Sequence, residues 1–137
     1  MTQILKAKIE QDLKKSQAHL EYSFAKVQKI NLEELNEQDN ETLETLESFS
    51  SRFARFSDLA VSRYLRFLAT ENDPAFRGTL IDLLHLAEKQ GWIESAQDWR
   101  RIRELRNIAA HEYSADDYRK LYKELINLCP HLLKFKF

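Results

Sequence analysis

The sequence predicts an all-α fold, an antiparallel up-and-down bundle of four to five helices, formed by a single domain over residues 1–137. Only two Gly and two Pro occur in the chain, so few positions oblige a helix or a strand to turn. Leu, Glu, Lys, Gln and Arg, which are all good helix formers, are abundant. Because a sheet needs more turn residues, we expect helices joined by short connections.

The first helix is predicted to be long, from about Thr2, a candidate N-cap, to about Lys29. Its apolar residues recur at helical spacing: Ile9, Leu13, Leu20, Phe24 and Val27. The segment INLEELNEQDNET interrupts this pattern, and it offers Asn36, Asp39 or Asn40 as the cap of the next helix.

The second helix is predicted over about 41–70. Its apolar seam steps by three and four residues, provided that Arg63 is allowed in the line: Leu46, Phe49, Phe53, Phe56, Ala60, Arg63 and Phe67. Four phenylalanines in this seam indicate a wide contact surface.

The third helix is predicted to follow a turn at Asn72 and Asp73, because Pro74 suits the first turn of a helix. It continues to Gln90, where Gly91 takes the left-handed position after the last turn. Its apolar stripe consists of Phe76, Leu80, Leu83, Leu84 and Ala87.

The fourth helix is predicted to begin near Ser95 and to reach at least Ala110. The fifth opens at Ser114, with Asp117 as the acidic partner in a capping box, and Pro130 kinks or ends it. Its inward residues are Tyr118, Leu121, Tyr122, Leu125, Leu128, Cys129 and Leu132.

Charge is distributed unevenly although the net charge is only −1. Residues 1–50 contain ten acids, six Lys and no Arg, whereas residues 51–137 contain twelve acids and fifteen bases, ten of them Arg. Mixed charges of this kind are typical of solvated helix faces with ordinary ion pairs. The alternative is a guanidinium-lined concave surface for phosphate, because Arg offers a planar, bidentate fork that Lys lacks.

Cysteine and hydropathy patterns restrict the location and the cofactors that we expect. Cys129 is the only cysteine, and no Cys/His cluster has zinc spacing, so we expect a reducing, cytoplasmic location, no metal and no cofactor. The N-terminal segment MTQILKAKIEQDLKK carries a charge every few residues. It therefore fits neither a signal peptide nor a membrane-spanning helix, and we expect no membrane partner.

The stretch RELRNIAAHEYSADDY, residues 103–118, places Arg106 among apolar helix positions. At about 100° per residue, Arg106 falls within the arc of Ile102, Leu105, Ala109 and Tyr113. Burying an unpaired guanidinium costs several kcal/mol. Arg106 must therefore form an ion pair, extend its guanidinium to the protein surface, or face a solvent-filled cleft.

His111 lies about 140° from Arg106 on a regular helix, so the two side chains cannot point at one spot. The helix can unwind near Ala110, or a second copy of the chain can bring its own Arg106 and His111 across a two-fold axis. We favour both together, with the phenylalanine-rich second helix supplying apolar surface for the dimer.

Arg, Asn, His and Tyr form a suitable set for RNA cleavage by the 2′-hydroxyl. His exchanges protons near neutral pH, and Arg stabilises the charge of the phosphorane without a metal. Asn107, one turn before His111, can orient the imidazole or the phosphate. The competing interpretation is structural, with a solvated His111, an ion-paired Arg106 and Tyr113 as a core aromatic.

The octet RNIAAHEY resembles the signature of HEPN domains, in particular the HepT-like toxins that pair with minimal nucleotidyltransferases: Arg, four residues, His, one residue, Tyr. The resemblance extends over nearly the whole chain, including the segments DPAF, LLHLAEKQGWI and SADDYRKLYKEL. It implies a homodimeric bundle whose Arg and His line a cleft between subunits, and a metal-independent endoribonuclease. Arg106 would stabilise the phosphate and His111 would transfer the proton, with Asn107 assisting.

The same resemblance implies a partner, a cognate minimal nucleotidyltransferase antitoxin that transfers AMP to the motif tyrosine, here Tyr113. An added phosphate beside Arg106 and His111 would occupy or repel the RNA path. A sibling group, the nucleotidyltransferase substrate-binding proteins, shares the bundle, a similar RN...H.Y stretch and a tryptophan at the position of Trp99. Similarity to that group implies a non-catalytic partner that completes a nucleotidyltransferase active site, and a bare dimeric scaffold is a third interpretation.

Overall fold

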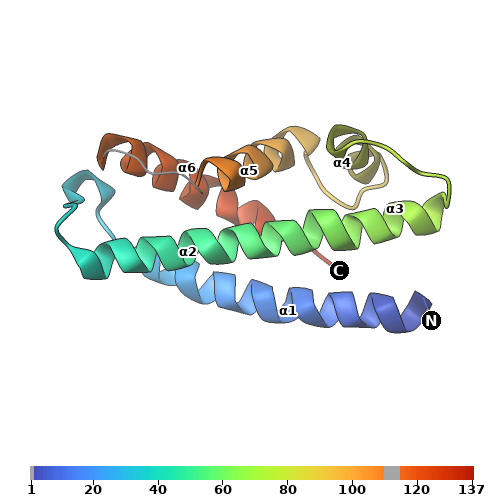
Figure 1. The fold of residues 1–137 in the computed structure, drawn as a ribbon, viewed down its shortest axis with the longest axis horizontal. Helices are drawn as coiled ribbons and strands as arrows, with labels where there is room; N and C mark the ends of the chain where they lie inside the picture. Colours follow the sequence, from blue (N-terminus) through green and yellow to red (C-terminus); the bar gives the residue numbers. More distant parts are fainter. Residues whose placement is uncertain (1, 110–114) are drawn as a thin grey trace.

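The computed structural model describes residues 2–109 and 115–137, and the regular elements in these ranges are all helical. They are α1 (Thr2–Val27), the short 3₁₀ turn η1 (Leu32–Glu34), α2 (Asn40–Asp58), the π segment η2 (Leu59–Leu65), α3 (Arg66–Asn72), α4 (Leu80–Lys89), α5 (Ala96–Ile108) and α6 (Ala115–Leu133). Because α2, η2 and α3 follow one another without a break, they form one long helix over residues 40–72 (Figure 1). The predicted all-α bundle is confirmed.

The helices pack around one core. The chain runs along α1 and returns along the long helix, so these two lie side by side and antiparallel, while α5 and the first turns of α6 lie on the other side of the long helix (Figure 1). Helix α6 contacts α1, α2 and α5, and the buried apolar side chains of all these helices form a single cluster. Helix α4 is seen nearly end-on in Figure 1 and therefore crosses the other helices. No helix in the described ranges is long and apolar enough to span a membrane.

Several helix ends lie where the capping residues predict. The Asp39 side chain accepts a hydrogen bond of 3.1 Å from the Thr42 amide, and the Ser95 side chain accepts one of 3.1 Å from the Asp98 amide. Gly91 follows α4 with a φ of 78°, a conformation that L side chains rarely adopt. Capping side chains thus set the starts of α2 and α5, and a glycine closes α4.

The third helix begins later than predicted. Pro74 lies in a loop, and α4 starts only at Leu80. The reason is a capping box: the Thr79 amide donates to the Asp82 carboxylate at 2.9 Å, and the Asp82 amide donates to the Thr79 hydroxyl at 3.2 Å. These two bonds satisfy N-terminal amides that a helix starting at Pro74 would have to satisfy elsewhere.

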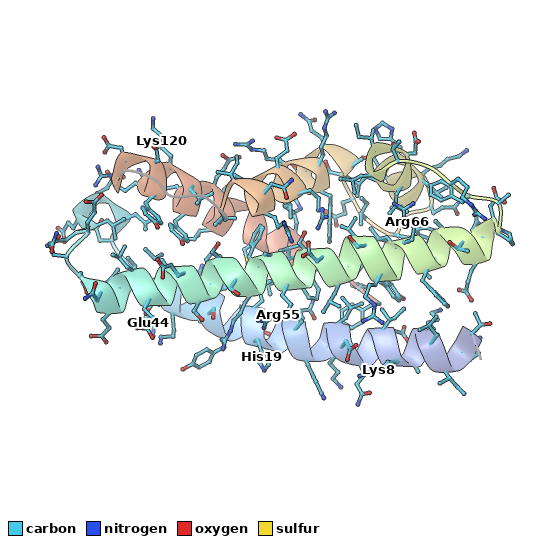
Figure 2. All side chains as sticks on the ribbon, in the orientation of Figure 1. Lys8, His19, Glu44, Arg55, Arg66 and Lys120 are labelled. Carbon is cyan, nitrogen blue, oxygen red and sulfur yellow. The ribbon has the colours of Figure 1, made fainter. Side chains whose placement is uncertain are left out.

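The loop before α4 is held against α3 by Arg66 (Figure 2). Its Nη1 donates to the Gly78 carbonyl at 2.9 Å, and its guanidinium lies 5.9 Å from the centroid of the Phe76 ring. A Cβ on Gly78 would lie 2.6 Å from Phe76 and 2.7 Å from the Asp82 side chain, so the close approach requires glycine. Phe76 therefore packs against the core from a loop rather than from a helical stripe.

The seam of the long helix is confirmed as far as Ala60 and then shifts. The buried residues that follow are Val61, Tyr64, Leu65 and Ala69. An α-helical continuation predicts Arg63 in this line, but the Arg63 side chain is 44% exposed, so that prediction is wrong. A π turn contains an additional residue, so η2 rotates the following residues relative to an α-helix.

Three of the four seam phenylalanines, Phe49, Phe53 and Phe56, are fully buried within the chain. They pack on other aromatic rings, with centroid distances of 6.1 Å between Phe49 and Phe53 and 6.3 Å between Phe56 and Phe135. The expectation that this seam offers apolar surface to a second copy is therefore wrong for these residues, because the single chain already covers them.

Helix α6 continues past Pro130 to Leu133. Of the two predicted effects of Pro130, a kink or the end of the helix, the second is therefore wrong. The Gln17 side-chain amide on α1 lies 3.0 to 3.3 Å from the carbonyl oxygens of Leu132, Leu133 and Phe135. Carbonyl groups at a helix C-terminus have no partner within the helix, so Gln17 satisfies groups that would otherwise need water. Phe135 packs on Trp99, with ring centroids 5.2 Å apart, and anchors the end of the chain.

Gln17→Ala is expected to lower the free energy of unfolding by about 1 to 2 kcal/mol, because three partly buried carbonyl groups lose their donor. Urea unfolding followed by circular dichroism measures this. Gln11→Ala is the matched control, since Gln11 is exposed on the same helix, and it should change the stability by only a few tenths of a kcal/mol. Equal effects of the two substitutions would contradict the role of Gln17.

Candidate active site

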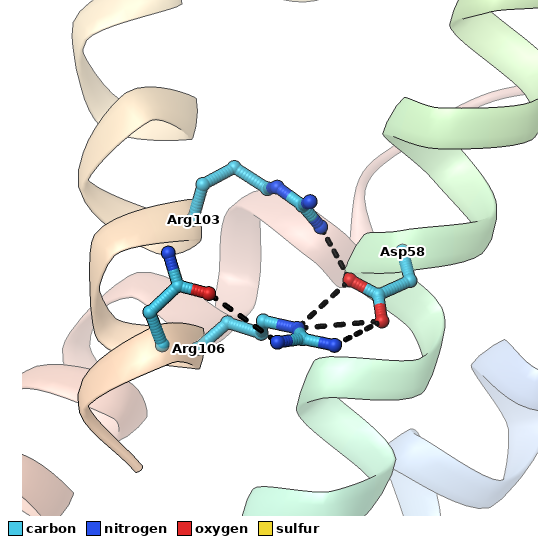
Figure 3. Close-up of polar contacts among 4 residues, drawn as sticks. Asp58, Arg103 and Arg106 are labelled. Carbon is cyan, nitrogen blue, oxygen red and sulfur yellow. Dashed lines mark hydrogen bonds and ion pairs between the residues drawn. The ribbon is translucent and has the colours of Figure 1, made fainter. Parts of the chain in front are cut away.

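The candidate site lies between the last turns of α5 and the middle of the long helix. Helix α5 buries Trp99, Ile102 and Leu105, which leaves Arg103 and Arg106 at the edge of its core-facing side. Both arginines reach across to Asp58, the last residue of α2 before the π segment (Figure 3). One carboxylate on one helix therefore binds two guanidinium groups on another.

The bonds to Asp58 fix the plane of the Arg106 guanidinium. Nε of Arg106 lies 3.1 and 3.3 Å from the two carboxylate oxygens of Asp58, and Nη2 lies 2.9 Å from Oδ2. Arg103 donates from Nη1 to Oδ1 of the same carboxylate. Two donors on one edge of a guanidinium make the bidentate geometry that specifies orientation as well as energy. Of the options open to Arg106, ion pairing is the one observed.

Both charges of the pair stay in contact with water. The Arg106 side chain is 37% exposed and that of Asp58 is 36% exposed, whereas Arg103 is 19% exposed. Burial alone would raise the pKa of Asp58, but the hydrogen bonds and charges of Arg106 and Arg103 outweigh it and hold this pKa below its ordinary value. The same contact raises the pKa of Arg106, which therefore remains cationic throughout the physiological range.

Donors remain on Arg106 after these bonds are counted. A guanidinium has five N–H groups, and the described contacts use Nε, one N–H of Nη2 and one N–H of Nη1. The Nη1 bond goes to Oδ1 of Asn107 at 3.3 Å, so the predicted site residue Asn107 contacts Arg106 (Figure 3). Two N–H groups of Arg106 have no bond to a described residue and can bind an anion.

A shallow surface depression of about 360 Å³ lies beside these groups. Its lining residues come from α2, η2 and α5: Asp58, Leu59, Ser62, Arg63, Arg103 and Arg106. Three of the six are arginines and one is a carboxylate, so the depression is cationic. Within the described ranges, no group of three or more His, Cys, Asp or Glu residues is arranged to hold a metal ion.

The other two predicted site residues, His111 and Tyr113, lie outside the described residues, as does Ser114, the predicted start of the fifth helix. Helix α5 ends at Ile108, with Ala109 as its C-cap, and Ala110, which the fourth helix was predicted to reach, lies outside the described residues. The angle of about 140° between Arg106 and His111 assumes a continuous helix. Because His111 lies outside the described residues, this angle stays a prediction.

Sequence reasoning missed Asp58 and Arg103. The seam gave no signal for Asp58, because this residue lies two positions from both Phe56 and Ala60 and therefore on nearly the opposite side of a regular helix. An arginine at the core edge needs a counter-ion, but the sequence does not identify which acid supplies it. Arg103, one turn before Arg106, is one of several arginines on α5, and nothing in the sequence distinguishes it from the others.

Asp58→Asn should lower the free energy of unfolding at neutral pH by about 1 kcal/mol, because it removes a partly exposed, bidentate charge pair. The folded-state pKa of Asp58 is lower than its ordinary value of 3.8, so the carboxylate stabilises the fold above that pH. This contribution is lost as the pH falls through the folded-state pKa. The difference between the wild-type chain and the variant should therefore be constant above about pH 5 and shrink below about pH 4.

Urea unfolding at a series of pH values measures this difference. Glu44→Gln is the control, since Glu44 is an exposed acid on the same helix that forms no ion pair with another described residue (Figure 2). If Asp58→Asn matched Glu44→Gln at every pH, the charge pair would contribute nothing to the fold.

The C-terminal part of the chain is similar to a known protein family. Residues 75–136 match the family described as Ribonuclease HepT-like. No curated protein and no solved structure gives a significant match. The matched range contains α4, α5, α6 and the RNIAAHEY octet, but not α1 or the long helix that carries Asp58. The predicted resemblance is therefore confirmed over residues 75–136, where the chain is similar to the HepT-like ribonucleases.

Proposed function

We propose that the chain is the toxin of a HEPN/minimal nucleotidyltransferase toxin–antitoxin system and acts as a metal-independent endoribonuclease in the cytoplasm. The match to HepT-like ribonucleases supports a HEPN toxin-type function in general. The observation that carries the proposal further is the state of Arg106. Its guanidinium is anchored on one edge by Asp58, is 37% exposed, and has two N–H groups without a bond to a described residue, which can bind a phosphate.

In the proposed reaction, the 2′-hydroxyl of the substrate loses its proton and its oxygen attacks the adjacent phosphorus. The bond from phosphorus to the 5′ oxygen breaks, and the products are a 2′,3′-cyclic phosphate and a 5′-hydroxyl that takes up a proton. Negative charge on the non-bridging oxygens increases in the transition state, where a fixed cation stabilises it. Arg106 supplies that cation, and His111 transfers the proton because imidazole titrates near neutral pH.

Asn107 has a positioning role in this proposal. Its side-chain oxygen accepts from Nη1 of Arg106, while Asp58 binds the opposite, Nε edge of the same group. The guanidinium is therefore held from two sides, and its open N–H groups face a restricted set of directions. A cation that is already oriented needs no reorganisation when charge develops on the substrate.

We further propose that two chains form a homodimer that brings both motifs to one cleft, and that a cognate minimal nucleotidyltransferase acts as the antitoxin. Tyr113 belongs to the same motif as Arg106, so transfer of AMP to it would add a negatively charged phosphate to this motif. That phosphate would compete with RNA for the same guanidinium groups.

Incubation of the purified chain with total cellular RNA in EDTA should yield defined fragments. His111→Ala should reduce the cleavage rate by about 100-fold or more, and Arg106→Lys by a similar factor, because Lys cannot keep the bidentate bond and also face the phosphate. Fragment analysis by gel electrophoresis and end-group mapping of the cyclic phosphate provide the measurement.

Two matched variants control for folding and charge. His19→Ala removes an exposed histidine on α1, and Arg55→Lys changes an exposed arginine on the long helix, and both should cleave as the wild-type chain does (Figure 2). Loss of cleavage in EDTA would exclude the metal-free mechanism. Equal cleavage by His111→Ala and the wild-type chain would remove His111 from it.

The alternative is a non-catalytic nucleotidyltransferase substrate-binding partner. Trp99, the tryptophan shared with that group, is 2% exposed and packs on Phe135, so it acts as a core residue and favours neither function. Expression of the lone chain separates the two. Toxicity that Arg106→Ala abolishes supports the nuclease, whereas harmless expression with nucleotide-dependent binding to the nucleotidyltransferase supports the binding partner.

A further inference from the structure

The depression beside Arg106 contains further positive charge in addition to that of Arg106 itself. Arg63 and Arg103 line it together with Arg106, and among the described lining residues Asp58 is the only carboxylate. Three positive charges against one negative charge leave an excess of two. The Asp58 carboxylate is already bound by Arg103 and Arg106, so Arg63 is the arginine of the depression that it does not bind.

Arg63 reaches this surface because of the π segment. In a continuous α-helix, Arg63 would lie on the same core-facing side as Ala60. With the π segment η2, the residues buried after Ala60 are instead Val61, Tyr64 and Leu65. Ser62, the residue before it, is also exposed and lines the same depression. The π segment therefore places a hydroxyl and a guanidinium beside the motif arginine, on a helix that the HepT-like match does not include.

The present partner of Arg63 is weakly bound. Its Nη1 lies 3.4 Å from Oδ2 of Asp12 on α1, and Asp12 is also paired with Lys8 at 2.9 Å. Exposed ion pairs of this kind contribute about 0 to 1 kcal/mol. Arg63 can therefore exchange Asp12 for a phosphate at little cost, and Lys8 still neutralises Asp12 afterwards.

We infer that Ser62, Arg63 and Arg103 form a second phosphate subsite, which binds an RNA backbone phosphate next to the one at Arg106. The inference rests on the proposed endoribonuclease function. An open depression of about 360 Å³ suits a chain that passes over the surface rather than an enclosed small molecule. Leu59 adds an apolar side chain to the lining, which a ribose can contact, and the arginines supply the planar donors that bind phosphate bidentately.

The test measures binding of a fluorescent single-stranded RNA oligonucleotide by anisotropy, with all chains carrying His111→Ala so that the RNA stays intact. Arg63→Gln should weaken binding by about threefold to tenfold at low salt and reduce the slope of log K against log salt by about 0.7, the value for one lost phosphate contact on a single strand. Arg63→Lys, which keeps the charge, should keep most of the slope. Ser62→Glu adds a negative charge to the depression and should weaken binding more than Arg63→Gln does.

Arg55→Gln is the matched control, since it removes the same charge from an exposed position of the same helix outside the depression. Circular dichroism verifies that each variant is folded. If Arg63→Gln and Ser62→Glu behaved like Arg55→Gln while Arg106→Gln weakened binding, the second subsite would be disproved and the proposed function would stand. If the parent chain bound no RNA and the wild-type chain cut none, the proposed function would fail and the subsite with it.

Discussion

The arrangement of the candidate site depends on a single carboxylate, Asp58, held between two arginines of the neighbouring helix. Arg103 and Arg106 lie three residues apart on α5, a spacing at which like charges repel. Asp58 compensates this repulsion, and its two bonds to one edge of Arg106 fix the plane of that guanidinium. Because the pair is partly exposed, its contribution to stability is modest. Its larger effect is on orientation, since a cation that is held in place before the substrate arrives stabilises charge without reorganising.

The π segment connects this site to the core. It begins directly after Asp58, and it changes which residues of the long helix face inward. Burial of Val61, Tyr64, Leu65 and Ala69 offsets the poorer hydrogen-bond geometry of a π turn. The same change of register turns Arg63 out to the surface beside Asp58. Packing of the core and the charge of the depression are therefore two results of one local irregularity, and such irregularities occur frequently at functional sites.

The sequence predicted the parts of this protein that depend on local rules. Asp39, Ser95 and Gly91 mark helix ends because capping acts over a few residues, and the apolar spacing located the core faces of most helices. The π segment was not predictable, because periodicity analysis assumes one helical repeat throughout. The late start of α4 was missed although the signal was present, since the Thr79 and Asp82 capping box outweighs Pro74. At the site, the need of Arg106 for a partner followed from burial, but the identity of that partner depends on how two helices pack.

The most direct test of the account is a double-mutant cycle between Asp58 and Arg106. The free energy of unfolding is measured at neutral pH for the wild-type chain, for Asp58→Asn, for Arg106→Gln and for the double variant. If Asp58 orients Arg106 as the distances indicate, the two substitutions are not additive and the coupling is about 1 kcal/mol, in the range of partly exposed bidentate pairs. Additive effects, with no coupling beyond the error of the measurement, would contradict the claim that this carboxylate holds the motif arginine.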